Sequence, residues 1–224
     1  MSGITTAYCA SAKAEHYAAA HCFDTTVTPT GTTSTNFVLT SMSSNAGISV
    51  GNSVSGTNVV SGSVVASIDS SSQITISKAT TGSGSSITFT ISGDVFKVAL
   101  IIPSPTGTYG AASTNYANIT VNSDEVSGTG YTATGTAMTN VGPVISGTGA
   151  YINFSPNPSW TSATFSARGC MIYNTIARLG VASATGTGRA MGVFDFGGTQ
   201  SVSAGTFTVL MPAAALSTAV FSIA

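Results

Sequence analysis

The chain has 224 residues, and only 13 carry charged side chains, six basic and seven acidic, for a net charge of −1. This balance argues against nucleic acid or an anionic membrane as a partner, because binding to either depends on clustered positive charge. The six Lys and Arg residues are dispersed, so no phosphate-binding stripe is expected. The 42% hydrophobic content suffices for a core of one large or two small domains.

One helix is predicted near the N-terminus, at residues 5–22, which are rich in alanine and contain no glycine or proline. On such a helix Cys9 and Cys22 would lie about 20 Å apart at ~1.5 Å per residue, too far for a disulfide. The third cysteine is Cys170. We therefore expect three free thiols that act as small buried side chains in a protein made in a reducing cytosol.

Residues 30–93 consist almost entirely of Ser, Thr, Gly, Val and Ile. Short runs of β-branched residues separated by turn signals predict strands, and the alternation of Ile87, Phe89 and Ile91 is the clearest of them. The predicted strands are 36–40, 48–54, 63–68, 73–77 and 86–91. Short strands at this spacing are typical of a small β-sandwich or barrel module.

Residues 94–224 predict a second and larger β unit. Its first strand, 94–102, is almost wholly apolar and is expected to be buried. The other predicted strands are 116–121, 125–134, 150–154, 163–168, 169–174, 189–196, 206–211 and 217–223. The apolar C-terminal segment contains Pro212 and alternates like a strand, so no membrane span is expected.

One ion pair follows from this strand assignment. If 169–173 and 189–196 form a hairpin, Arg168 lies almost opposite Asp195, which predicts a cross-strand ion pair. In a chain with so few charges, we interpret the pair as a structural one that fixes the strand register, rather than as a catalytic dyad.

Sites for other chemistry are not predicted. His16 and His21 would lie about 140° apart on a helix, so they do not converge on a metal. Asp124 and Glu125 are adjacent and would point to opposite faces of a strand, which suits a solvated strand entrance better than a glycosidase pair. The chain lacks a Gly-x-Ser-x-Gly elbow. The sequence therefore predicts no catalytic, metal or cofactor-binding residue and no enzyme.

The aromatic residues leave a binding role open. Five of them could provide stacking faces for a sugar on a β scaffold: Tyr109, Tyr116, Tyr131, Tyr151 and Trp160. The other interpretation, which we favour, is that Trp160 fills the core between strands.

Several stretches of the chain resemble a family of virion proteins from tailed bacteriophages. These stretches are 5–13, 96–100, 122–133, 165–174, 193–197 and 204–209. Residues 29–93 depart from the simpler family members and resemble small β modules that recur in phage structural proteins. The resemblance thus implies an all-β protein whose sandwich or jelly-roll-like domain, with one N-terminal helix, is discontinuous (1–29 plus 94–224) and carries an inserted β module (30–93).

The resemblance also implies a function without catalytic residues or cofactors. The expected protein is a capsid cement (decoration) protein that binds the major capsid protein and neighbouring copies of itself, as a dimer or trimer, and stabilises the shell. It would be made in the bacterial cytoplasm and lie on the capsid surface of the virion. The alternative is a tail or fibre protein that binds host surface glycans.

Overall fold

The computed structural model describes residues 3–17, 21–175 and 188–223. The predicted all-β fold is confirmed: 48% of the chain is strand and 5% is helix. The chain divides into two compact units. We call Cys22–Asp94 with Asn140–Pro143 the module, and Met1–His21, Val95–Thr139 and Val144–Ala224 the main unit. No helix in the described part of the chain is both long and apolar enough to cross a membrane.

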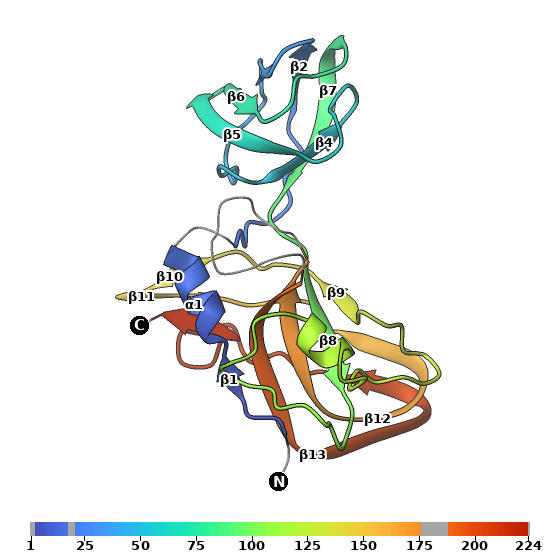
Figure 1. Ribbon diagram of the computed structural model, residues 1–224. Helices are drawn as coiled ribbons and strands as arrows, with labels where there is room; N and C mark the ends of the chain where they lie inside the picture. Colours follow the sequence, from blue (N-terminus) through green and yellow to red (C-terminus); the bar gives the residue numbers. More distant parts are fainter. Residues whose placement is uncertain (1–2, 18–20, 176–187, 224) are drawn as a thin grey trace. The chain divides into compact units, whose positions relative to one another are not determined.

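The module is a single antiparallel sheet that curls into a nearly closed barrel (Figure 1). Its two end strands meet through mutual backbone hydrogen bonds between Thr32 and Thr40, at 2.8 and 3.1 Å. In spatial order the strands are β2 (Thr30–Ser34), β7 (Ser83–Ser92), β4 (Ser53–Gly56), β5 (Ser63–Ser70), β6 (Gln73–Ile76) and β3 (Val38–Leu39).

The apolar residues of these strands form the core of the module. Ile74, Ile76, Phe89 and Ile91 alternate with exposed or partly exposed neighbours, and all four are fully buried. Two glycines give Phe89 its space, because a Cβ on Gly31 or Gly56 would lie 3.0 Å from its ring. The period-2 pattern in the sequence thus places one face of each strand inside the barrel.

The predicted module strands differ from the observed ones at two places. The 48–54 strand begins only at Ser53, because 49–52 form a turn in which Asn52 Oδ1 accepts from the Ser49 amide at 2.6 Å. The strand Thr30–Ser34 was not predicted, and it pairs with β7.

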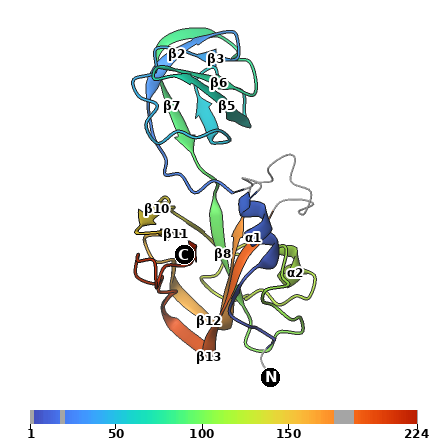
Figure 2. The same ribbon diagram turned by 90° about the vertical axis from the view of Figure 1, so that its left-hand side faces the viewer.

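The main unit is built on a five-stranded antiparallel sheet, which Figure 2 shows with β12 and β13 as its longest members. Its order is β1 (Ala7–Tyr8), β13 (Arg189–Thr208), β12 (Ser159–Asn174), β8 (Phe96–Ile101) and β9 (Thr136–Met138). The sheet is buried on both faces where β12 and β13 pair beside β8: every residue of 169–174 and of 189–193 is buried. Residues 163–168 and 169–174, predicted as separate strands, belong to the single strand β12, and 206–208 belong to β13.

A second, three-stranded sheet completes the main unit. It consists of β10 (Val144–Ser146), β11 (Gly149–Ile152) and β14 (Phe221–Ile223). Phe221 packs on Tyr8 and Phe194, with ring centroids 4.7 and 6.2 Å apart. The C-terminal strand therefore contacts residues of the five-stranded sheet.

The prediction of a helix over 5–22 is wrong at both ends, because neither 5–9 nor 21–22 is helical. The helix α1 spans Ala10–Tyr17, and Ala7–Tyr8 form β1, which pairs with β13 at Gly192 and Val193. The amide of Thr5 donates to the carbonyl of Tyr109 at 2.8 Å. Pairing with existing strands outweighs the helix propensity of this alanine-rich segment. Residues 18–20 lie outside the described residues.

The predicted strands 116–121 and 125–134 are also wrong. Residues Ala117–Thr120 form the short helix α2, because local Asn side chains bond to nearby amides: Asn115 Oδ1 accepts from the first amide of the helix, that of Ala117, at 2.8 Å. Asn118 Oδ1 accepts from the amide of Thr114, which precedes the helix, at 3.0 Å. Residues 125–134 make only isolated bridges, at Glu125 and Thr129, joined by turns.

The two ends of the module are hydrogen-bonded to each other. The amide of Asp94 donates to the carbonyl of Cys22 at 2.7 Å, and the amide of Cys22 donates to the Asp94 carboxylate at 3.0 Å. The side chain of Asn140 donates to the Asp94 carbonyl at 3.1 Å. These bonds join the incoming and outgoing chains where the module begins and ends.

Gly135, which precedes β9, provides a test of how closely this segment packs against β8. Gly135 has φ +69°, and a Cβ there would overlap the carbonyl group of Val98 in β8. We expect Gly135→Ala to lower the free energy of unfolding by about 2–3 kcal/mol, from backbone strain plus displacement of β8. The control is Gly147→Ala, at φ +59° with nothing within 4 Å, where strain alone costs about 1 kcal/mol. Equal losses in urea unfolding of the two variants would contradict the predicted clash.

Candidate functional site

Arg168 and Asp195 form the ion pair that the hairpin suggests. β12 pairs with β13 at Gly169 and Asp195, and Arg168 Nε donates to Asp195 Oδ1 at 2.7 Å. The hydrogen bond from Arg168 holds the pKa of Asp195 below its usual value. The Asp195 carboxylate also accepts from the Gly197 amide at 2.9 Å. The pair thus fastens β13 to β12 where their regular ladder is interrupted.

Asp124 is not a solvated residue at a strand entrance, as the sequence suggested. Its side chain is fully buried and accepts hydrogen bonds from the amides of Thr106 and Gly107, at 2.9 and 2.8 Å, and from the hydroxyl of Tyr109. Burial by itself raises the pKa of Asp124, but these hydrogen bonds outweigh burial and leave the pKa below its usual value. Asp124 therefore anchors the 102–109 loop.

Glu125 lies beside it in sequence and serves a different loop. Its carboxylate accepts from the hydroxyls of Tyr116 and Tyr131 and from the amide of Thr134, the last two at 2.8 Å. Tyr116 stacks on Tyr173 with ring centroids 4.6 Å apart. Adjacent carboxylates thus turn to separate partners, and they do not form a shared acid–base site.

The histidines form a buried cluster that sequence reasoning missed. His21 Nε2 lies 2.7 Å from Glu15 Oε2, with both side chains fully buried, and Asn174 Nδ2 lies 2.9 Å from His21 Nδ1. The ring centroids of His16 and His21 lie 5.6 Å apart, and burial lowers the pKa of His16. Helix geometry could not reveal the cluster because His21 lies beyond the end of α1. Full burial makes it a link between α1 and β12.

Within the described residues no disulfide joins the three cysteines, and Cys9 and Cys170 are buried. Burial, followed by the nearby charge of Glu15, raises the pKa of Cys9 to about 12, and burial raises that of Cys170 to about 12. Neither is a nucleophile at neutral pH. Within the described residues no group of three His, Cys, Asp or Glu side chains could hold a metal ion.

Of the five aromatic residues considered for sugar stacking, Tyr109 and Trp160 are buried, and the other three are half-buried. Trp160 is buried against Tyr131, Phe165 and Phe207, at centroid distances of 5.8, 6.4 and 6.1 Å. Tyr109 is buried beside Asp124. This favours the interpretation of Trp160 as a core residue.

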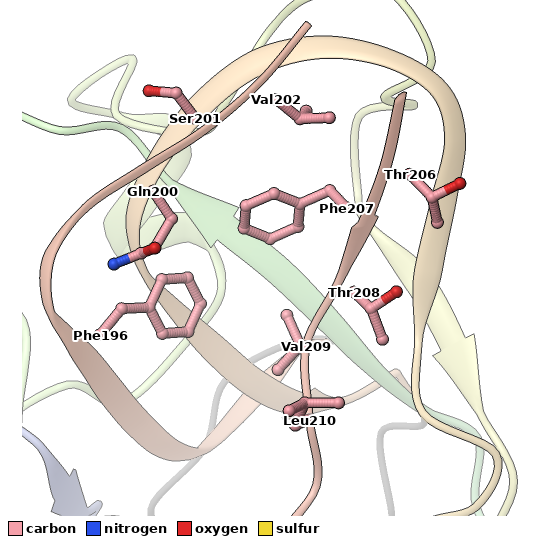
Figure 3. A pocket seen from close by; sticks show the side chains of 9 residues that line it. All are labelled: Phe196, Gln200, Ser201, Val202, Thr206, Phe207, Thr208, Val209 and Leu210. Atoms are coloured by element: carbon pink, nitrogen blue, oxygen red, sulfur yellow. The ribbon is translucent and has the colours of Figure 1, made fainter. Parts of the chain in front are cut away.

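A groove of about 460 Å³ opens on the main unit between two arms of β13. Figure 3 shows the rings of Phe196 and Phe207 and the side chain of Gln200 between the arms. Val202 lines one side, and Leu210, which is 76% exposed, lies at one end. The nine residues that line the groove include no charged side chain.

The module carries a second surface feature, a set of exposed large apolar side chains. Phe37 and Val50 are 53% and 60% exposed, and Val64 and Ile68 on β5 are also exposed. Residues 22–94 hold four charged side chains, Asp24, Asp69, Lys78 and Asp94, and Asp94 is buried. The module surface is therefore polar but largely uncharged.

Comparisons with known proteins return no match for this chain among protein-family models, curated proteins or solved structures.

Proposed function

We propose that this protein is a non-enzymatic structural component of a tailed-bacteriophage virion, and specifically a cement protein on the capsid surface. It binds the major capsid protein and neighbouring copies of itself, as a dimer or trimer, and stabilises the shell. The exposed apolar side chains of the module carry this proposal, because buried apolar area supplies the affinity of an uncharged interface. Many weak contacts on one shell add up through multivalency.

The use of the ionisable groups also supports a structural role. The acidic residues Asp124, Glu125 and Asp195 all fasten loops or strands through two or more hydrogen bonds. Glu15 is fully buried with His21. These ionisable side chains stabilise the fold, whereas acid–base catalysis needs ionisable side chains in a site that the substrate can reach.

Binding to shells tests the proposal. Particles assembled without the protein are titrated with the purified chain, and the bound protein is measured by sedimentation. We expect the double variant Phe37→Ser, Val50→Ser to bind about 10- to 100-fold more weakly, because two exposed apolar side chains lose their buried area. The wild-type protein should also raise the temperature at which the particles release DNA.

The matched control is Val121→Ser, since Val121 is 76% exposed but belongs to the main unit. It should bind like the wild type. If the double variant bound shells as tightly as the wild type, the exposed apolar side chains of the module would not form the interface. A count of a few copies per virion, instead of hundreds, would replace the cement function with that of a tail or fibre protein.

A further inference from the structure

The groove on β13 is a built feature of the strand pairing. β13 pairs with β12 at Asp195 and again at Gln200, and between these points residues 196–199 stand opposite Arg168 alone. Gly197, with φ +78°, allows the backbone to bulge here. The bulge redirects the strand, so that its two arms enclose the space that Figure 3 shows.

The backbone of β13 is accessible along this groove. β1 pairs with the outer edge of β13 only at Gly192 and Val193. Beyond Asp195, no other strand of the described residues pairs with that edge. The edge therefore offers amide and carbonyl groups beside the side chain of Gln200, whose amide is both a donor and an acceptor.

The side chains define the kind of ligand that fits. The half-buried Phe196 ring supplies an apolar face, and its centroid lies 6.3 Å from that of Phe207, whose ring is buried beneath the groove among Trp160 and Phe165. Gln200 supplies the polar side chain between the arms. The nearest charge in the sequence, Asp195, is neutralised by Arg168. The groove volume of about 460 Å³ falls in the range of roughly 300–1,000 Å³ for small-molecule sites.

From this combination we propose that the groove binds a neutral oligosaccharide. The C–H face of a sugar ring packs against Phe196, and the hydroxyl groups bond to Gln200 and to the edge of β13. An anionic sugar finds no cation among the lining residues. This activity is separate from attachment to the shell, which we assign to the module.

The single tryptophan of the chain provides the readout. The ring centroid of Trp160 lies 6.1 Å from that of Phe207, which lines the groove. The full-length protein is titrated with maltohexaose, cellohexaose and chitohexaose, and with hexagalacturonate as the charged counterpart. We expect at least one neutral hexasaccharide to change the fluorescence saturably, with a Kd of roughly 0.1–1 mM, and hexagalacturonate to leave it unchanged.

Variants connect the signal to the groove. Gln200→Ala and Phe196→Ala should each weaken binding about tenfold, measured by calorimetry as well as by fluorescence. Ser127→Ala, at an exposed position outside the groove, should bind like the wild type. Absence of saturable binding by all three neutral sugars, equal binding of hexagalacturonate, or unchanged binding by both groove variants would overturn the proposal. Shell binding is measured independently, so the two functions can fail separately.

Discussion

Replacing Asp124 by alanine should lower the free energy of unfolding by about 3–5 kcal/mol, since a buried charged acceptor is lost while several donors stay buried. The donors are the amides of Thr106 and Gly107 and the hydroxyl groups of Thr106 and Tyr109. Without the carboxylate, the loop that these residues form has no common anchor. Urea unfolding followed by far-UV circular dichroism measures the loss.

A graded variant separates the carboxylate from its partners. Tyr109→Phe removes one of the donors and keeps the ring, so it should cost only about 1–2 kcal/mol. If Tyr109→Phe were as destabilising as Asp124→Ala, the ring environment and not the carboxylate would hold the loop.

The same carboxylate makes stability depend on pH. The pKa of Asp124 is lower in the folded chain than its usual value of 3.8, because hydrogen bonds to the ionised carboxylate outweigh its burial. The carboxylate of Asp124 therefore makes its full contribution to the free energy of unfolding above that value. This contribution is lost as the pH falls through the lower pKa of the folded state. The difference in stability between the wild type and Asp124→Asn should accordingly narrow as the pH falls from 6 to 2. A constant difference over this range would show that the carboxylate is not ionised in the folded protein.

The second large effect is expected in the module. Phe89→Ala empties the centre of the barrel, where Phe89 is fully buried, and should cost about 3–5 kcal/mol. Because the module has its own core, we expect amide hydrogen exchange to accelerate in β4–β7 and to remain slow in β8 and β12.

Val50→Ala is the control for this variant, because Val50 is 60% exposed. It should leave exchange in both units close to that of the wild type. Equal acceleration in β8 and β12 after Phe89→Ala would mean that the module and the main unit unfold as one cooperative unit.

Apolar periodicity was sufficient to predict some of the strands. The alternation of Ile87, Phe89 and Ile91 predicted a strand with one buried face. In the structure Phe89 and Ile91 are buried and Ile87 is partly buried. The continuous apolar run of 94–102 predicted the buried strand β8. Side-chain period and burial are local properties, so the sequence contains them directly.

Long-range pairing explains where the predictions went wrong. Ala7–Tyr8 form a strand because β13 offers a partner, and no local pattern signals that partner. Ala117–Thr120 form the helix α2 because Asn115 and Asn118 bond to nearby amides, a signal that could have been read from two asparagines three residues apart.

The candidate sites were the least predictable part. The Arg168–Asp195 pair followed from a hairpin register, so it was accessible from sequence. The Glu15–His21 pair and the groove of β13 were not, because the first depends on how the chain turns after α1 and the second on a bulge at 196–199.

The hydrogen bonds that join Cys22 to Asp94 have a consequence for the tolerance of the chain to change. Because these two residues are bonded to each other, the chain leaves the strands of the module next to where it enters them. Closely spaced ends of this kind are those at which added or removed residues are best tolerated. The segment 23–93 can therefore vary in length with little displacement of the residues that precede Cys22 and follow Asp94.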